Sequence, residues 1–326
     1  MRALIHRSAE SLLLLWLVVS LTFLLAHLAP GDAADLLVPP SAAPAEVARI
    51  RHDLGLDAPL AAQYARWIGG VLRGDLGESF STQEPVTRVL GRALPVSLAL
   101  GAISLTLTFV VGVALGLWQA ARQGTWKDRA ATFVSMTVYA APSYWLALAV
   151  VALFTYSASQ WGFPDWLRLP AFGIRSPAQV AAGVTSLGDV LRHAILPVSV
   201  LSAIGAAGIA RYARASALDL LGHEWVRTAR AKGVPERGVL GRHVLGNALP
   251  PLVVLLALSL PGVVAGSVFV EGIFAWPGMG RALLGAIASR DHPVVLGATV
   301  LYATMVIVAN ALADVALTLV DPRRRS

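Results

Sequence analysis

Six apolar stretches alternate with polar segments along the chain, and each is close to the length needed to cross a bilayer. A helix rises about 1.5 Å per residue, so roughly 20 apolar residues cross a hydrocarbon core of about 30 Å. The pattern predicts an all-α, polytopic membrane protein with six transmembrane helices. These are expected at residues 12–28, 96–121, 130–156, 194–210, 248–269 and 294–319.

The spans divide the chain into four regions. Residues 1–28 form the N-terminal tail and first span, with an uncleaved anchor favoured over a signal peptide because five more spans follow. Residues 29–95 are an extracytoplasmic segment with short amphipathic helices. Residues 96–320 are a five-helix core that includes a polar loop at 211–247, and residues 321–326 are a basic tail.

The outer segment carries one clear amphipathic stretch, residues 59–72. Tyr64, Trp67 and Ile68 lie on one of its sides in a helix. Two compatible interpretations remain open. The stretch is either an interfacial helix lying on the membrane or part of a docking surface for an extracytoplasmic partner.

Charge sets the expected orientation. With the N-terminus inside, the inner segments hold 15 of the 26 Lys and Arg residues, and 12 of the 19 acidic residues fall outside. Lys and Arg accumulate in cytoplasmic loops, so both termini are expected to be cytoplasmic. The net charge of +7 has the same origin and does not indicate nucleic-acid binding.

Composition supports a membrane protein and excludes cysteine chemistry. Hydrophobic residues make up 56% of the chain and charged residues only 14%, whereas soluble domains carry about 25% charged residues. The chain has no Cys, so neither a disulfide framework nor a Cys-based metal site can form.

The loop at 211–247 is strongly basic and lies between two spans. Residues 210–232 are rich in good helix formers, and Gly233 suits the position just after a helix. Arg230 and Lys232 favour the negative helix end, and Pro235 suits the start of the next helix. We expect a helix, a sharp turn and a second helix. It is either an interaction element or a solvated basic loop.

The end of this helix resembles a known signature. Permease subunits of ABC importers carry a Glu-Ala-Ala-x-x-x-Gly loop, and residues 227–233 here read Arg-Thr-Ala-Arg-Ala-Lys-Gly. Ala229 and Gly233 match, whereas Arg227 stands where the superfamily has Glu. The longer form Glu-Trp-Val-Arg-Thr-Ala-Arg-Ala-Lys-Gly, residues 224–233, resembles the variant of the dipeptide/oligopeptide/nickel permease subfamily.

Further matches extend the resemblance over the whole chain. They include Leu-Ala-Pro-Gly-Asp at 28–32, Gly-Asp-Leu-Gly at 74–77, Ala-Pro-Ser-Tyr-Trp-Leu at 141–146, Glu-Gly-Ile-Phe-Ala-Trp-Pro-Gly-Met-Gly at 271–280 and Arg-Asp-His-Pro-Val at 290–294. Together they identify the chain as similar to the B-type permease of a heterodimeric pair. The resemblance implies a type I ABC importer permease fold in the bacterial inner membrane.

The resemblance also implies partners. A second homologous permease would complete the pathway, two ATP-binding cassette subunits would drive it with ATP and Mg²⁺, and an extracytoplasmic binding protein would deliver substrate. The loop would be the helix that couples this chain to an ATPase. Its residues are Glu224, Arg227, Ala229, Ala231, Lys232 and Gly233.

No catalytic, cofactor-binding or metal-binding residue is predicted in this chain. It contains no Gly-x-x-x-x-Gly-Lys-Ser/Thr phosphate loop, so ATP must be hydrolysed by another subunit. An exposed patch of small side chains at Ala229 and Ala231 would let that subunit approach closely.

The transport pathway has weaker candidates. Pro142 and Pro261 are expected to kink their spans, with simple helix-end geometry as the alternative. Glu271, Trp276, Pro277 and Gly278 are candidates for an outer gate or re-entrant element, with a Gly-rich turn as the alternative.

Several functions compete. Import of di- or oligopeptides is favoured, and import of nickel or another metal chelate is the alternative, weakly supported by residues 80–83. His27 could contact a chelate, but a lone His is more often an interface residue. An intramembrane hydrolase would need a catalytic set within the spans, and none is convincing. A channel would not need the coupling loop.

Overall fold

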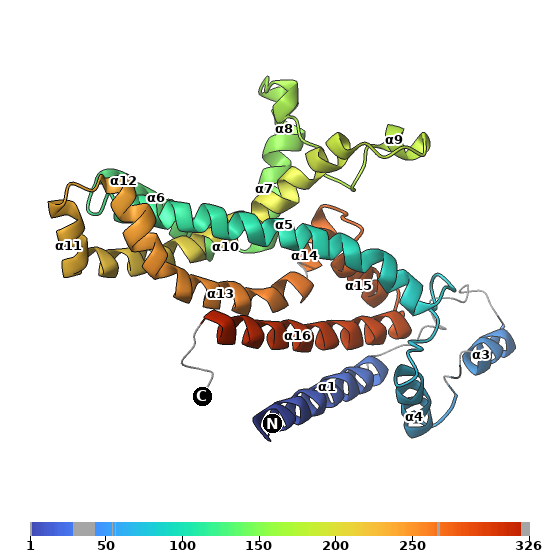
Figure 1. Cartoon of the computed structure of the whole chain (residues 1–326). Helices are drawn as coiled ribbons and strands as arrows, with labels where there is room; N and C mark the ends of the chain where they lie inside the picture. Colours follow the sequence, from blue (N-terminus) through green and yellow to red (C-terminus); the bar gives the residue numbers. More distant parts are fainter. Residues whose placement is uncertain (1, 29–42, 54, 56, 266–267, 321–326) are drawn as a thin grey trace. The chain divides into compact units, whose positions relative to one another are not determined.

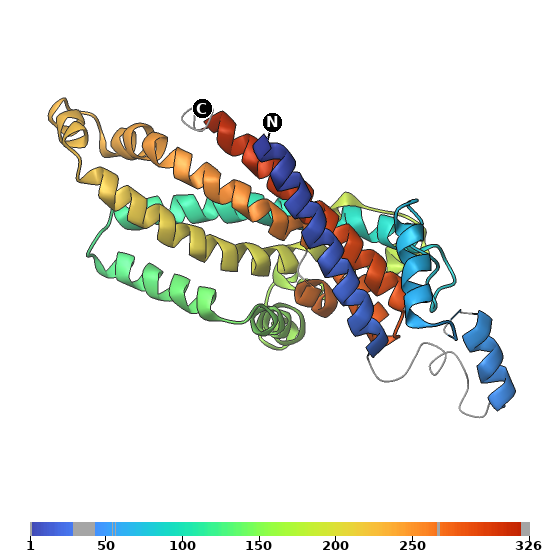
Figure 2. The ribbon, with the colours of Figure 1, turned by 90° about the horizontal axis from the view of Figure 1, so that it is seen from below.

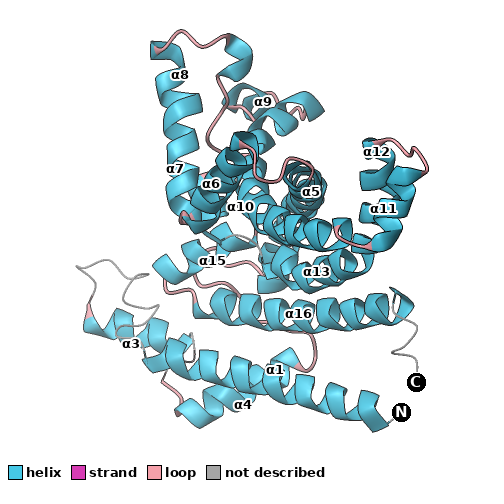
Figure 3. Cartoon of the chain, turned by 90° about the vertical axis from the view of Figure 1, so that its left-hand side faces the viewer, coloured by secondary structure: helices cyan, strands magenta, loops and turns pink. Residues whose placement is uncertain are grey.

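The computed structural model describes residues 2–28, 43–53, 55, 57–265 and 268–320 (Figure 1). In these residues the chain consists of helices and loops without a strand (Figure 3), which confirms the all-α prediction. The chain forms two compact units. Unit 1 comprises residues 1–97 and 277–308, and unit 2 comprises residues 98–276 and 309–326.

The predicted spans all have helical counterparts. Five described helices are long and apolar enough to cross a membrane: Glu10–Leu28, Val86–Ala120, Leu187–Leu221, Glu236–Val263 and His292–Val315. The predicted third span was wrong as a single helix. It is a broken pair, Trp126–Ala140 and Ser143–Tyr156, bent by 106°.

Unit 1 contains the N-terminal helices and the segment that follows Trp276. Its elements are α1 (Arg2–Leu28), α3 (Pro44–Asp53), α4 (Leu60–Val71), the first part of α5 (Val86–Ala120), α15 (Met279–Ala288) and most of α16 (His292–Val320). Its core packs Val86 and Leu90 of α5 against Met279 and Val294. This packing explains why α5 begins at Val86, earlier than the predicted residue 96.

The aromatic side of α4 faces α1. The hydroxyls of Tyr64 and Ser20 are 2.6 Å apart, and the Phe23 ring lies 5.2 Å from that of Tyr64 and 5.5 Å from that of Trp67. Tyr64 and Trp67, which were expected to face a membrane or a partner, therefore pack against α1 within unit 1. The expected motif at residues 28–32 falls largely outside the described residues, and the basic tail at 321–326 falls wholly outside them.

Unit 2 holds the remaining helices. They are the rest of α5, α6 (Trp126–Ala140), α7 (Ser143–Val151), a π-helical turn η1 (Ala152–Tyr156), α8 (Ser157–Gln160), a 3₁₀ turn η2 (Asp165–Leu167), α9 (Pro177–Ala181), α10 (Leu187–Leu221), α11 (Glu224–Ala231), α12 (Glu236–Gly238), a π-helical turn η3 (Val239–Val244), α13 (Leu245–Ala265), α14 (Val268–Ile273) and the end of α16.

Helices α5 and α10 pack backbone to backbone. A Cβ on Gly116 would lie 2.5 Å from the carbonyl oxygen of Ala210, and one on Gly112 would lie 2.9 Å from that of Ala206. Small residues allow this close approach, which is how membrane helices gain packing without a hydrophobic driving force. Helix α10 also runs alongside α6 (Figure 2). It is longer than the predicted span at 194–210.

The break between α6 and α7 falls at Ala141 and Pro142. Ala141 is extended (φ −73°, ψ 136°) and so is Pro142 (φ −60°, ψ 137°). Proline has no N–H to donate and disfavours a helical conformation in the residue before it, so the helix ends there. The expected kink within one span at Pro142 was wrong, and the alternative of helix-end geometry holds, because Pro142 is the N-cap of the separate helix α7.

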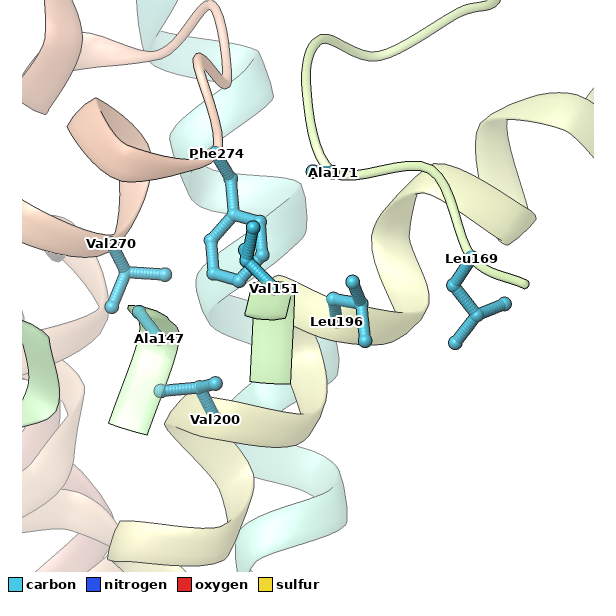
Figure 4. Close-up of a cluster of buried hydrophobic side chains, with 8 residues drawn as sticks. All are labelled: Ala147, Val151, Leu169, Ala171, Leu196, Val200, Val270 and Phe274. Carbon is cyan, nitrogen blue, oxygen red and sulfur yellow. The ribbon is translucent and has the colours of Figure 1, made fainter. Parts of the chain in front are cut away.

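Helix α7 is nevertheless held firmly by unit 2. Its Ala147 and Val151 are buried with Leu196 and Val200 of α10 and with Phe274, which follows α14 (Figure 4). The turn after η2 adds Leu169 and Ala171 to this cluster. Burial of these side chains fixes the direction of the chain after the break.

Candidate functional site

The predicted coupling segment forms a separate short helix. We expected one helix over residues 210–232, but α10 ends at Leu221 and α11 begins at Glu224. Gly222 caps α10, and His223 is extended (φ −77°, ψ 148°). Glycine weakens a helix interior because ordering its backbone costs the most entropy. The interior Gly222 is therefore a helix end, and α11 lies where the chain turns from α10 towards α13 (Figure 1).

Helix α11 ends in a Schellman motif centred on Gly233. The amide of Val234 donates to the carbonyl of Ala229 (3.2 Å), and the amide of Gly233 donates to that of Arg230 (3.0 Å). Gly233 has φ +77°, the left-handed conformation that favours glycine at this position. The prediction that Gly233 ends the helix is confirmed. The motif gives the turn a defined shape.

One side of α11 is anchored in unit 2. Val226 is fully buried, and it packs with Ala120 of α5, Ala217 of α10, and Val239 and Val244 of η3. A helix of eight residues is too short to be stable alone in water. Its position therefore depends on this apolar cluster.

The opposite side of α11 is exposed. Glu224, Arg227, Ala231, Lys232 and Gly233 are all accessible. The expected patch of small side chains was half wrong, because Ala229 is only 6% exposed and faces the anchoring cluster. The helical spacing explains this, since Val226 and Ala229 are three residues apart and share one face. The accessible side is thus mostly charged.

Two ion pairs organise the exposed charges. Arg227 donates to the carboxylate of Glu224 within one helical turn (2.9 Å). Arg230 donates two hydrogen bonds to Glu236 (3.2 and 2.7 Å), which joins α11 to α12 across the turn. The hydrogen bonds to Glu236 raise the pKa of the Arg230 guanidinium above its ordinary value. The pair links the two helices across the turn, and both of its side chains stay exposed to solvent.

The pathway candidates of unit 2 differ in their local structure. Pro142 lies at the break between α6 and α7, whereas α13 runs through Pro261 as one helix. Glu271 is fully buried in α14, and Trp276 is 4% exposed with its indole N–H lacking a hydrogen-bond partner.

The remaining two gate candidates open the second segment of unit 1. Pro277 is exposed, and Gly278 is buried as the N-cap of α15. The next amide, that of Met279, donates to the hydroxyl of Ser97 (2.8 Å). The start of α15 is therefore fixed to α5 within unit 1.

Sequence reasoning missed a buried carboxylate that organises unit 1. Asp291 is 1% exposed and accepts hydrogen bonds from the hydroxyls of Ser79 (2.6 Å) and Ser81 (2.7 Å) and from the amides of Phe80 and Ser81 (both 3.1 Å). The sequence matches at 80–83 and 290–294 were noted separately. Nothing in either match indicated that they meet.

A second missed feature is the ion pair that joins α6 to α10. Arg214 donates two hydrogen bonds to Asp128 (2.9 and 2.8 Å), whose side chain is 3% exposed. Asp128 also stands three residues after the N-cap Thr125, which accepts from its amide. That Thr-x-x-Asp spacing is a signal for the start of α6, but it does not indicate a partner in α10.

His27 has partners on both ring nitrogens. Nδ1 lies 2.8 Å from the carbonyl of Phe23, and Nε2 lies 3.2 Å from the side-chain oxygen of Gln63. His27 is thus an interface residue between α1 and α4. No group of three or more metal-ligating side chains occurs in the part of the chain that the structure describes.

Comparisons with known proteins place nearly the whole chain in one family of membrane transport components. Residues 112–326 match the family described as the inner membrane component of binding-protein-dependent transport systems, and residues 1–101 match the N-terminal region described for the same components. The oligopeptide transport system permease protein OppB of Mycobacterium bovis is 38% identical over 326 residues, covering 99% of both chains. The oligopeptide transport system permease protein AppB of Bacillus subtilis is 33% identical over 320 residues, covering 98% of both.

Proposed function

The chain belongs to the family of inner membrane components of binding-protein-dependent transport systems, and from this membership we propose how it works. It is an ABC importer permease of the bacterial inner membrane that forms half of the translocation pathway for di- or oligopeptides. A second homologous permease forms the other half, and an extracytoplasmic binding protein delivers the peptide. Two separate cassette subunits hydrolyse ATP with Mg²⁺, since this chain carries no phosphate loop.

The observation that carries the mechanism is the construction of α11. Its inner face is fixed by Val226 in the apolar cluster, and its outer face presents Glu224, Arg227 and Lys232. A short helix anchored in this way moves as a rigid body, so a shift of the ATPase passes to the helices that α11 contacts. A flexible loop would absorb that shift.

Peptide is favoured over a metal chelate as the substrate. OppB and AppB are both named oligopeptide permeases, and they align with this chain from end to end. His27, the one residue considered as a possible contact for a chelate, has both ring nitrogens within hydrogen-bond distance of Phe23 and Gln63. Neither nitrogen is free to bind a metal in this arrangement.

The test is ATP-driven uptake by the assembled transporter in liposomes. Labelled di- and oligopeptides are compared with a nickel chelate, with and without ATP. We expect ATP-dependent peptide uptake and no chelate uptake. Uptake of the chelate alone would overturn the substrate assignment, and uptake independent of ATP would overturn the coupling mechanism.

A matched pair of glycine variants tests the role of the turn. Gly233→Glu places a charged side chain at φ +77°, whereas Gly241→Glu places the same side chain at an exposed glycine without a positive φ. Uptake should fall sharply in the first variant and stay near wild type in the second. Equal uptake in the two would contradict the coupling role of the Gly233 turn.

A further inference from the structure

A mostly apolar cleft of about 200 Å³, with two arginines in its walls, lies between α6 and α10 in unit 2. Its walls include Met136 and Tyr139 of α6 and Arg211 and Arg214 of α10. A cleft with two arginines beside apolar spans is unusual, because charged side chains in such helices are rare and mark functional sites. Neither the coupling helix nor the pathway candidates account for it.

The two arginines differ in their partners. Arg214 uses Nε and Nη2 to bind both oxygens of Asp128, so this pair is neutral, while its Nη1 N–H groups remain available as donors. Arg211 is exposed and has no carboxylate partner among the described residues. Its guanidinium carbon lies 5.1 Å from the centre of the Tyr139 ring, which orients the group without neutralising it. The cleft therefore carries one uncompensated positive charge.

The position of Arg211 along α10 matches a membrane surface. Residues 194–210 before it contain no charged residue, and α10 continues beyond it to Leu221, a further 15 Å or so at 1.5 Å per residue. On the orientation expected from the Lys and Arg distribution, this is the cytoplasmic leaflet. Anionic lipids enrich that leaflet, and basic clefts between membrane helices bind their headgroups.

The neighbouring surface of α6 suits acyl chains. Phe133 is 72% exposed and Met136 is 55% exposed, and both lie on the helix that forms one wall of the cleft. The volume is also informative, since pockets that enclose a small-molecule ligand usually measure roughly 300–1,000 Å³. This smaller cleft fits a headgroup whose tails remain outside.

We propose that this cleft binds the phosphate of an anionic phospholipid from the cytoplasmic leaflet. Arg211 pairs with the phosphate, and Arg214, held in place by Asp128, supplies further N–H donors. The bound lipid joins α6 to α10 just before α10 leads into the coupling helix. Its acyl chains lie along the exposed apolar side of α6.

The test measures lipid retained by the assembled transporter. The complex is reconstituted in nanodiscs of phosphatidylcholine with phosphatidylglycerol, released into detergent, and analysed by native mass spectrometry. Arg211→Gln is compared with Arg129→Gln, which removes the same charge from an exposed position on α6 that does not line the cleft. Arg211→Lys keeps the charge.

We expect the wild type to retain phosphatidylglycerol in preference to phosphatidylcholine. Arg211→Gln should lower this retention about fivefold, the effect of one basic residue on anionic lipid, while Arg129→Gln leaves it unchanged and Arg211→Lys largely preserves it. Melting temperatures of the complexes check that the exposed substitutions leave the fold intact. Lipid retention is measured without ATP or peptide, so the lipid proposal can fail while the proposed transport function holds, and the reverse.

Three outcomes would overturn the proposal. The first is a wild type without preference for phosphatidylglycerol. The second is equal loss in Arg211→Gln and Arg129→Gln, which would indicate non-specific attraction. The third is displacement of the lipid by saturating dipeptide, which would assign Arg211 to the substrate instead.

Discussion

Two tight turns in this permease are stabilised in opposite ways. In unit 1, the loop from Ser79 to Ser81 closes around the buried carboxylate of Asp291, which accepts four hydrogen bonds. In unit 2, the turn at Gly233 is closed by backbone hydrogen bonds and by the exposed Arg230–Glu236 pair. The carboxylate of Asp291 is buried in the first turn, whereas Arg230 and Glu236 are exposed at the second.

The difference separates structural from interactive polar groups. A buried carboxylate is stabilising only while all its hydrogen bonds are made, so Asp291 leaves no capacity for a partner. The Gly233 turn takes its shape mainly from main-chain hydrogen bonds, with an exposed ion pair beside them. Its side chains are therefore free to contact another subunit, as a coupling element requires.

Substituting Asp291 should have the largest effect on stability. Asp291→Ala removes the acceptor of four hydrogen bonds and leaves the buried hydroxyl of Ser79 without its carboxylate partner, so we expect the free energy of unfolding to fall by about 3 kcal/mol. Thermal unfolding of the purified transporter measures the change. Asp75→Ala is the control, because its exposed carboxylate accepts from the nearby amide of Gly77. A loss of unfolding free energy no larger than that of the control would mean that the buried carboxylate of Asp291 does not stabilise unit 1.

Adding one methyl group at Gly233 should have an intermediate effect. Gly233→Ala meets no neighbouring atom but must adopt φ +77°, which costs an L-residue about 1–2 kcal/mol. Gly241→Ala also meets no atom and has no positive φ, so it should be neutral or stabilising. Hydrogen exchange of the α11 amides should increase only in Gly233→Ala. Equal exchange in both variants would show that the left-handed turn does not maintain the helix.

Breaking the exposed ion pair should have the smallest effect. Arg230→Gln and Glu236→Gln should each lower stability by at most about 1 kcal/mol, and the coupling between them should shrink at high salt. A double-mutant cycle from thermal unfolding at two salt concentrations measures this coupling. A coupling of several kcal/mol that is insensitive to salt would mean that the exposed pair stabilises the fold as strongly as the buried carboxylate of Asp291 does.

The sequence was most informative where a local rule decides the structure. Gly233 was predicted as a helix end because few other residues suit a left-handed position, and the apolar pattern located five spans and the apolar stretch that forms the broken pair. It was least informative where distant segments meet. No local pattern reveals that Asp291 binds Ser79, or that Arg214 binds Asp128, because these contacts depend on tertiary packing.

The errors have the same origin. Ala229 was assigned to an exposed surface because alanine is small, but its face of α11 is set by the position of Val226 in the apolar cluster. The third span was predicted as one helix with a kink at Pro142 because its apolar run is continuous. Hydropathy reports the length of a segment and not its direction.

Cysteine cross-linking tests the central claim most directly, because the chain has no native Cys and each introduced thiol is unique. Thr228→Cys and Ala231→Cys lie on exposed positions of α11, and Ala178→Cys lies on an exposed position of α9. In the assembled transporter, the first two should cross-link to a cassette subunit, and their cross-linking should change when ATP is added. The α9 variant should not cross-link. Absence of a cross-link from both α11 positions in a complex that hydrolyses ATP would contradict the account.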